Sequence, residues 1–179
     1  MSYGNYMSKI KKQLDYKDKI KNHFDRLAPE REAWIKKSGA FYSEDIRCIK
    51  ELIIPNSKVL EIGCGNGHLL ASLSPSVGVG IDISKEMISK AKSKYKNLEF
   101  IEADIEDTGC VKNLNKVFDF IIISDTIGYF KDIQKTLDML HKVCNADTRI
   151  IVAYYSPFWE PILNLAARIK LKMPELTKA

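Results

Sequence analysis

Residues Val59 to Leu70 read Val-Leu-Glu-Ile-Gly-Cys-Gly-Asn-Gly-His-Leu-Leu. A short apolar run is followed by glycines at alternate positions and a helix-like segment, which predicts a strand, a tight turn and a helix N-terminus. Such a turn presents backbone N–H groups to a ligand. Glu61 stands two residues before the first glycine. Because a carboxylate there would repel a pyrophosphate, a positively charged ligand is favoured over a dinucleotide.

The composition indicates one globular domain. The chain has 179 residues, of which 45% are hydrophobic and 28% are charged. No stretch approaches the roughly 20 apolar residues that span a bilayer, and the lysine-rich N-terminal segment lacks the apolar core of a signal peptide. The four cysteines are scattered, without a Cys-x-x-Cys pair. We therefore expect a cytoplasmic protein with reduced thiols and no metal.

The formal net charge of +5 is unevenly placed, with an excess of lysine near the N-terminus. Such a segment could contact nucleic acid or an anionic surface. Neither an arginine cluster nor interleaved aromatic residues accompany the lysines, so we favour the solvated face of a helix. Nucleic acid is therefore not expected as a partner.

Hydrophobic periodicity divides the chain near residue 54. Before that point apolar residues such as Ile20, Phe24 and Leu27 recur at helical spacing. We interpret residues 1–54 as a helical lid and residues 55–179 as the ligand-binding domain. After Pro55 short apolar runs alternate with helical segments. The expected strands are 58–62, 77–83, 98–103, 118–124 and 149–155, and the expected helices are 68–73, 84–95, 132–143 and 157–172.

Strands that alternate with helices indicate an α/β fold with a doubly wound, mostly parallel sheet covered on both faces. Ligands of such sheets bind at the carboxyl ends of the strands. The glycine turn, Asp82, Asp104 and Ser124–Asp125 each follow an expected strand. These polar features should therefore converge on one edge of the sheet.

Two aspartates at this edge have separate expected roles. Asp82 can accept the two hydroxyls of a ribose, or alternatively cap the following helix. Asp104 can accept a hydrogen bond from a purine amino group while Ile105 covers the ring, or alternatively be an ordinary turn acid. A ligand with an adenosine end, an amino-acid end and a positive sulfur satisfies these groups and Glu61, and that ligand is S-adenosylmethionine.

Four segments resemble the successive motifs of class I S-adenosylmethionine-dependent methyltransferases. They are Glu61–Gly67, Gly80–Met87, Glu102–Asp104 and Phe118–Asp125. The resemblance implies a Rossmann-like sheet of strand order 3-2-1-4-5 and methyl transfer to an acceptor. By position it implies that these residues bind the cofactor: Glu61, Gly63, Cys64, Gly65, Gly67, Asp82, Ile83, Met87, Asp104, Ile105 and Ser124.

A narrower resemblance concerns Arg26–Trp34, Phe41-Tyr42 and Tyr154–Pro161. These segments are similar to methyltransferase modules that are fused or adjacent to family 2 glycosyltransferases. The similarity implies a glycan-type acceptor and a functional association with a glycosyltransferase.

The end of the chain departs from the family pattern. The family closes its sheet with a sixth and a seventh strand, whereas no strand signal follows Tyr155. We therefore expect an incomplete piece of a longer protein, in which these two strands are absent. Unless residues 157–172 cover it, the fifth strand would be an exposed apolar edge through which a dimer could form.

Methyl transfer to an activated carbon has no obligatory catalytic side chain, so the catalytic residues stay unknown. If the acceptor must lose a proton, the candidate bases are Asp125 and Tyr129, ahead of His23 and His141. The expected acceptor is an oxygen or nitrogen of a small molecule or glycan. Four aromatic residues either line its pocket or belong to the core: Trp34, Phe41, Tyr42 and Tyr129.

Two other functions stay open. A nicotinamide-dependent oxidoreductase would use a G-x-G-x-x-G turn, but His68 stands at the third glycine position and no Tyr-x-x-x-Lys pair is present. A non-catalytic module would bind the cofactor without turnover.

Overall fold

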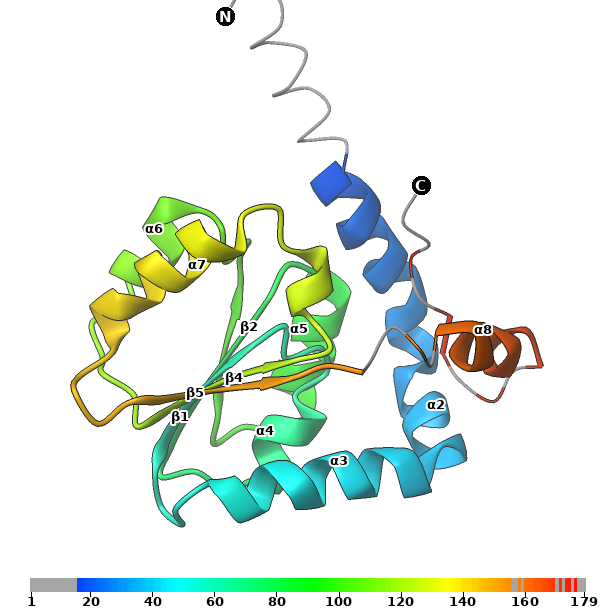
Figure 1. Ribbon diagram of the computed structural model, residues 1–179, viewed down its shortest axis with the longest axis horizontal. Coiled ribbons are helices and arrows are strands. Elements are labelled where there is room, and N and C mark those ends of the chain that lie inside the picture. The colour runs from blue at the N-terminus through cyan, green and yellow to red at the C-terminus, as the bar shows by residue number, and fades with distance from the viewer. Residues whose placement is uncertain are drawn as a thin grey trace, which may run out of the picture.

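A computed structural model describes residues 16–155, 158, 160–169, 171, 173–174 and 176. In this part of the chain five parallel strands form one sheet in the order β3-β2-β1-β4-β5 (Figure 1). The strands are β1 Lys58–Ile62, β2 Val77–Asp82, β3 Glu99–Glu102, β4 Phe120–Ser124 and β5 Arg149–Ala153. The predicted α/β class and strand order are confirmed.

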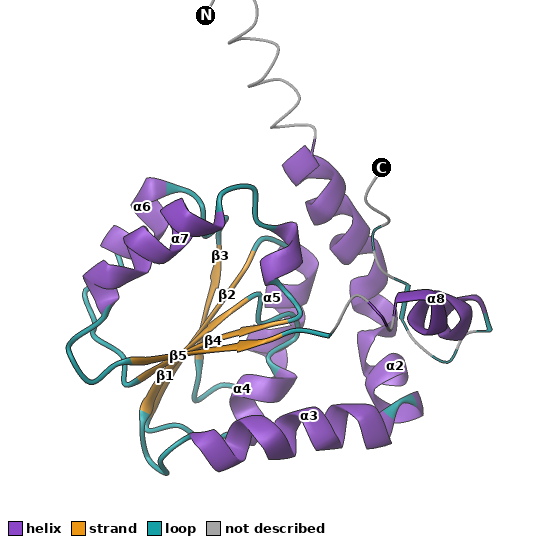
Figure 2. Ribbon diagram, viewed as in Figure 1, coloured by secondary structure: helices purple, strands orange, loops and turns teal. Residues whose placement is uncertain are grey.

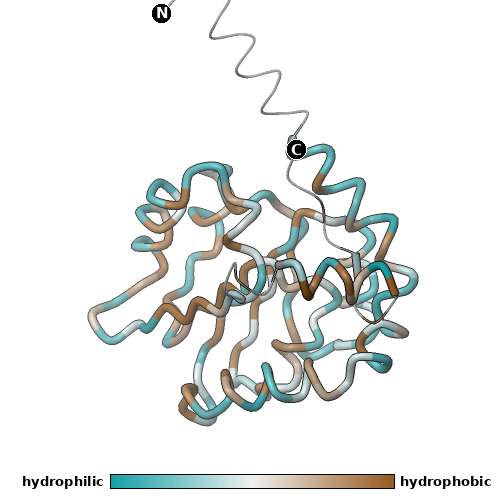
Figure 3. Tube along the Cα trace, turned by 45° about the vertical axis from the view of Figure 1, so that its right-hand side comes forward, coloured by the Kyte–Doolittle hydropathy of each residue, from teal (hydrophilic) through white to brown (hydrophobic). Residues whose placement is uncertain are grey.

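Helices cover both faces of the sheet (Figure 2). One face carries α6 (Thr108–Lys112), α7 (Ile133–Leu140) and η3 (His141–Val143), and the other carries α3 (Gly39–Leu52), α4 (His68–Ser72) and α5 (Lys85–Lys94). Successive side chains of a strand point to opposite faces of the sheet. Leu60 therefore packs against the face that carries α6, α7 and η3, and Val59 packs against the face that carries α3, α4 and α5. Hydrophobic residues follow the strands, and hydrophilic ones gather on the outer helices (Figure 3).

The described part of the predicted lid is helical. A helix covers residues 16–27 and is followed by η1 (Ala28–Glu30), α2 (Arg31–Lys37) and α3. Pro29 lies in the first turn of η1, where a proline ring is tolerated, and the chain breaks again at Ser38. Ile20 and Leu27 are buried, so the first of these helices is docked through apolar side chains.

The region after β5 leaves the sheet edge open. Helix α8 (Glu160–Arg168) lies beyond the carboxyl end of β5 rather than along the strand (Figure 1). Ile150 and Val152 of β5 therefore stay 38% and 47% exposed. The described residues beyond β5 contain no further strand. The predicted dimer through this edge stays a prediction.

The predicted elements differ from the observed ones mainly at their ends. The expected helix 132–143 is α7 followed by the separate 3-10 turn η3, and Asp132 caps α7 by accepting a hydrogen bond from Lys135 N at 2.9 Å. Helix α6 was not predicted. No described helix combines the length and the apolar character that crossing a bilayer requires.

Candidate active site

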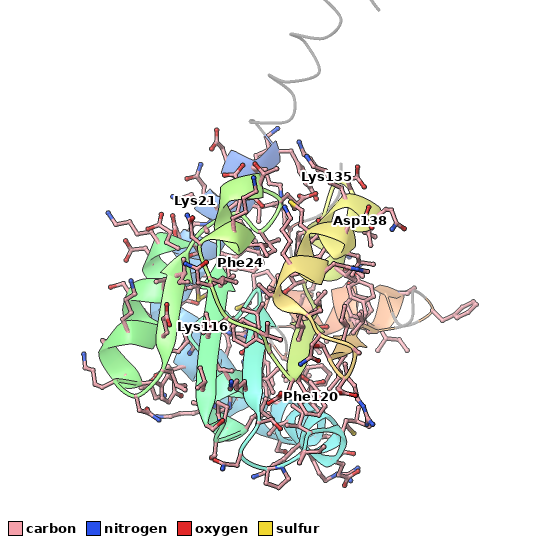
Figure 4. The ribbon with its side chains drawn as sticks, turned by 90° about the vertical axis from the view of Figure 1, so that its left-hand side faces the viewer. Lys21, Phe24, Lys116, Phe120, Lys135 and Asp138 are labelled. Atoms are coloured by element: carbon pink, nitrogen blue, oxygen red, sulfur yellow. The ribbon has the colours of Figure 1, made fainter. Side chains whose placement is uncertain are left out.

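A cavity of about 190 Å³ lies at the carboxyl ends of the strands. The loops after β1, β2, β3 and β4 form its floor, and the helix over residues 16–27, Arg31, α3 and Met173 complete its walls. The cavity is thus at the edge predicted from the sequence. Lys21, on the helix over residues 16–27, lies toward this end of the sheet, and Phe120, which begins β4, toward the other (Figure 4).

Nine of the eleven predicted cofactor residues line the cavity. They are Glu61, Gly63, Cys64, Asp82, Ile83, Met87, Asp104, Ile105 and Ser124. Gly65 and Gly67 are not among the lining residues, and both instead shape the turn. All three turn glycines have positive φ, at +74°, +52° and +76° along the chain, a conformation that costs other residues about 1–2 kcal/mol.

At Gly63 and Gly67, neighbouring side chains also leave no space for a Cβ atom. A Cβ on Gly67 would lie 2.6 Å from the ring of Phe100, and a Cβ on Gly63 would lie 2.8 Å from Cβ of Thr126. A Cβ on Gly65 would meet nothing within 4 Å. The turn is therefore packed at both ends and open at its centre.

Glu61 is buried beneath the turn, with 3% of its surface exposed. Its Oε2 accepts a hydrogen bond from Leu70 N in α4 at 3.0 Å. Burial raises the pKa of Glu61 to about 8, against the opposing effect of that N–H, and the nearby Asp82 raises it further. At neutral pH the side chain is therefore mostly protonated until a positive charge arrives. Nothing in the sequence around Glu61 indicates this proton, because the raised pKa comes from burial in the folded chain.

Asp82 joins the glycine turn to helix α5. Oδ2 accepts a hydrogen bond from Gly65 N and Oδ1 accepts one from Ser84 N, both at 2.8 Å. Ser84 in turn caps α5 by accepting from Met87 N at 3.1 Å. Because an ionised carboxylate has about four acceptor positions, these bonds leave capacity for ribose hydroxyls. Burial raises the pKa of Asp82, while the two N–H groups oppose that rise.

A lysine of the predicted lid pairs with Asp104. Lys17 Nζ lies 3.0 Å from Asp104 Oδ1 and also pairs with Glu106, and Glu106 N donates to the same Oδ1 at 3.0 Å. Ile105 beside it is buried. The lid therefore reaches the carboxylate that the sequence assigns to the purine.

Further polar contacts connect the predicted lid to β3 and to α5 with its N-cap. Lys21 Nζ pairs with Glu102 at 2.8 Å, and Lys94 Nζ pairs with Glu32 at 2.6 Å. Asp25 accepts hydrogen bonds from Ser84 Oγ at 2.6 Å and Glu86 N at 3.1 Å. On its other side the lid contacts the C-terminal segment, where His23 Nε2 donates to Pro174 O at 3.2 Å.

The aromatic candidates divide into two groups. Phe41, Tyr42 and Tyr129 line the cavity, together with Phe24, whose ring stands edge-to-face to Tyr129 with 5.4 Å between centroids. Trp34 is not among the lining residues, and its Nε1 donates to Glu30 at 3.2 Å. Of the candidate bases, Asp125 and Tyr129 line the cavity and His23 and His141 do not.

Six polar lining residues were not among the residues predicted from the sequence: Lys17, Arg31, Asp45, Asn66, His68 and Thr126. Asn66, inside the quoted turn, is 2% exposed and its Nδ2 has no hydrogen-bond partner among the described residues. A donor so placed normally finds a partner, which indicates a ligand acceptor. Lys17, Arg31 and Asp45 lie on helices, and the sequence carries no signal that these helices face the site.

Arg31 brings positive charge to the wall above the glycine turn. Its Nη1 donates to Tyr42 Oη at 2.8 Å and to Met173 Sδ at 3.6 Å, and the guanidinium lies 5.0 Å from the centre of the Tyr42 ring. Burial lowers the pKa of His68 at the start of α4, and Lys94 and Arg31 lower it further. Arg31 also acts on Glu61 and Asp82, where it favours the charged carboxylates.

Among the described residues no group of three or more His, Cys, Asp and Glu side chains is arranged to hold a metal ion. All four cysteines are free thiols.

Comparison with known proteins gives a consistent family. The family described as "Methyltransferase domain" matches residues 53–177. The chain is 28% identical over 131 residues to an uncharacterised protein of Methanocaldococcus jannaschii, a match that covers 73% of this chain and 60% of the relative. It is 27% identical over 169 residues to the malonyl-[acyl-carrier protein] O-methyltransferase of Acetivibrio thermocellus, which covers 87% of this chain and 57% of that protein. The chain thus spans less than two thirds of the length of both relatives.

Solved structures share the fold. The magnesium protoporphyrin IX methyltransferase of Synechocystis, crystallised with bound S-adenosylhomocysteine, matches with a TM-score of 0.67 at 17% identity, over 92% of this chain and 83% of that one. A methyltransferase of Thermotoga maritima, described as a possible histamine N-methyltransferase, matches with a TM-score of 0.66 at 18% identity, over 84% and 70% of the two chains.

Proposed function

This chain belongs to the methyltransferase domain family, and on that premise we propose that it transfers a methyl group from S-adenosylmethionine to a small-molecule or glycan-type acceptor. S-adenosylmethionine is the cofactor of the site. The observation that carries the proposal is the meeting of Glu61, Asp82 and Asp104 on one cavity, each at the carboxyl end of its own strand or directly after it.

The nucleoside end of the cofactor fits the β2 and β3 side of the cavity. Asp82 would hold the ribose hydroxyls, and Asp104 would accept the amino group of the purine. Met87 and Ile105, both buried, and Ile83 would provide apolar surface for the ring.

The methionine end fits the glycine turn. The free Nδ2 of Asn66 and the Arg31 guanidinium suit a carboxylate. Glu61 suits an ammonium, and the backbone of Gly63 and Cys64 lines the same wall. Ser124, at the end of β4, would face the methionine end next to the acceptor.

When bound, the cofactor supplies a methyl group already activated by a sulfonium. The residues of this chain then act by holding the acceptor in line with that carbon and by excluding water. Alignment of two reactants contributes about 7–11 kcal/mol to such a reaction. Phe24, Phe41 and Tyr129 form the apolar part of the wall for this purpose.

The glycan acceptor and the association with a family 2 glycosyltransferase are finer proposals. Their support is the sequence similarity of Arg26–Trp34 and Tyr154–Pro161 to modules of that kind. Labelled-methyl transfer to a panel of sugars and amino sugars tests the acceptor, and co-purification with the glycosyltransferase tests the association. The cytoplasmic location stays a prediction.

Calorimetry separates the proposed function from an oxidoreductase. We expect S-adenosylhomocysteine to bind and NADH to give no heat. Asp82→Asn should weaken binding by about 10- to 150-fold, because a carboxylate that accepts ribose hydroxyls contributes roughly 1.5–3 kcal/mol. Exposed Asp147, at the opposite end of the sheet before β5, provides the matched control Asp147→Asn. Binding of NADH in place of S-adenosylhomocysteine would overturn the proposal. Cofactor binding without methyl transfer to any acceptor would instead favour a non-catalytic module.

A further inference from the structure

One end of the cavity lies away from the residues predicted to bind the nucleoside. The strand order places β4 on the opposite side of β1 from β2 and β3. Ser124, Thr126 and Tyr129 lie at or after the end of β4, and Phe41 and Asp45 of α3 line the same cavity. Because the predicted nucleoside residues belong to β2 and β3, this end remains for the acceptor.

Asp45 is the carboxylate that α3 brings to this end. Ser124 Oγ donates a hydrogen bond to Asp45 Oδ2 at 3.5 Å, which joins the lid to the end of β4. The side chain lines the cavity and is half-buried. Burial raises the pKa of Asp45, and the Ser124 hydroxyl opposes that rise. Asp45 therefore lies next to the residue assigned to the methionine end and keeps capacity for a further hydrogen bond.

The charges around the cavity are divided between its ends. Among the described lining residues, Lys17 and Arg31 carry fixed positive charge. Lys17 is paired with Asp104 and Glu106 beyond β3, and Arg31 bonds to Tyr42 and Met173. The acceptor end thus combines the carboxylate of Asp45 with aromatic rings.

Such surroundings select the charge of the acceptor. An anionic acceptor would be repelled by Asp45 in a partly desolvated pocket. An ammonium would be attracted by that carboxylate and by the faces of aromatic rings such as Phe24 and Tyr129. Resting on the proposed function, we propose that the acceptor is a primary or secondary amine and that Asp45 binds its ammonium and takes its proton.

The proton balance of this step is complete. The ammonium gives one proton to the Asp45 carboxylate, which leaves a neutral amine with a lone pair. That lone pair forms the new nitrogen–carbon bond to the methyl group, and the carbon–sulfur bond breaks with its electron pair on sulfur. The methylated amine leaves as an ammonium, and Asp45 returns its proton to water. No other reactant is needed.

The test measures binding to the full chain saturated with S-adenosylhomocysteine. The probes are amine and alcohol partners of the same shape, namely 2-phenylethylamine with 2-phenylethanol and glucosamine with glucose, and phenylacetate as an anion. We expect at least one amine to bind about tenfold more tightly than its alcohol, with phenylacetate weakest. If no amine binds better than its alcohol, the proposal is wrong.

Variants then assign the preference to Asp45. Asp45→Asn should abolish the roughly tenfold preference for the amine over its alcohol. The same variant should leave the affinity for S-adenosylhomocysteine unchanged. Asp45→Glu should restore part of the amine preference. Glu44→Gln is the matched control, because Glu44 is the neighbouring exposed carboxylate of α3 and pairs with Arg47. An amine preference that survives in Asp45→Asn would overturn the proposal, as would a variant that loses S-adenosylhomocysteine instead. Failure of the wild-type chain to bind S-adenosylhomocysteine would count against the proposed function itself.

Discussion

The Lys17 ammonium lies 3.0 Å from Oδ1 of Asp104 and connects the lid to the loop after β3. The side chains of the pair are 15% and 21% exposed, so solvent screens this attraction less than it screens a surface pair. Lys17 also pairs with Glu106, and without it two carboxylates would face each other across this loop. The contact therefore stabilises both the docking of the helix over residues 16–27 and the orientation of Asp104.

Lys17→Met should weaken binding of S-adenosylhomocysteine by about fivefold, which corresponds to about 1 kcal/mol for the lost pair. The wild-type affinity should fall at higher ionic strength, and the variant should show a smaller fall. Lys116→Met is the control, because Lys116 pairs with Glu99 at the amino-terminal end of β3. Equal salt dependence in wild type and Lys17→Met would contradict this role.

Glu61 should make the unliganded protein less stable as the pH rises. In the folded chain its pKa is about 8, above the ordinary 4.5 of a glutamate. Between pH 4.5 and about 8 the folded chain keeps a proton on Glu61 that the unfolded chain has lost. The stability that this proton contributes is fully present below pH 4.5, falls as the pH rises and is lost once the pH passes about 8. Glu61→Gln, which can still accept from Leu70 N, should therefore gain in Tm over wild type as the pH increases. Parallel Tm curves for the two proteins would show that Glu61 does not titrate in this range.

Cofactor binding should release protons near neutral pH. The ammonium of S-adenosylhomocysteine near Glu61 would favour the carboxylate, and burial keeps the group mostly protonated beforehand. Calorimetric heats measured in buffers of different ionisation enthalpy should reveal the release, and Glu61→Gln should remove it. A wild-type heat that does not depend on the buffer would refute the coupling.

The glycine turn should respond very differently to alanine at its centre and at its end. Gly67→Ala combines a positive φ with a Cβ 2.6 Å from the Phe100 ring, so we expect a loss of about 2–4 kcal/mol in the free energy of unfolding. Gly65→Ala has the same backbone strain and open space, so about 1 kcal/mol is expected. Denaturant unfolding measures both. Equal losses would mean that packing against Phe100 is unimportant.

The sequence predicted the sheet well because burial on both faces requires continuous apolar runs, and Phe120–Ile123 forms such a run in β4. The sequence also predicted that Asp82 and Asp104 lie at the same edge of the sheet, because the carboxyl ends of parallel strands meet at one edge. Expected strand 118–124 began too early, because Phe118 is buried but bonds to Val143 outside the ladder. Helix α6 has only five residues and no periodicity to detect.

The side of the cavity formed by the N-terminal helices, and the role of Asn66, were harder to predict. Asp45 and Arg31 lie on helices whose pattern shows which face is apolar, but not where that face docks. Their approach to the site depends on long-range contacts, such as those of Ser124 with Asp45 and of Arg31 with Met173. Asn66 was within the quoted turn, but only the geometry shows that its amide lacks a partner.

The close approach of Gly63 and Thr126 restricts how this protein can evolve. Even after the hydroxyl and methyl of Thr126 were removed, its Cβ would lie 2.8 Å from a new Cβ at position 63. A descendant with alanine at 63 would therefore need glycine at 126 first, so changes in the two loops must arise in a fixed order.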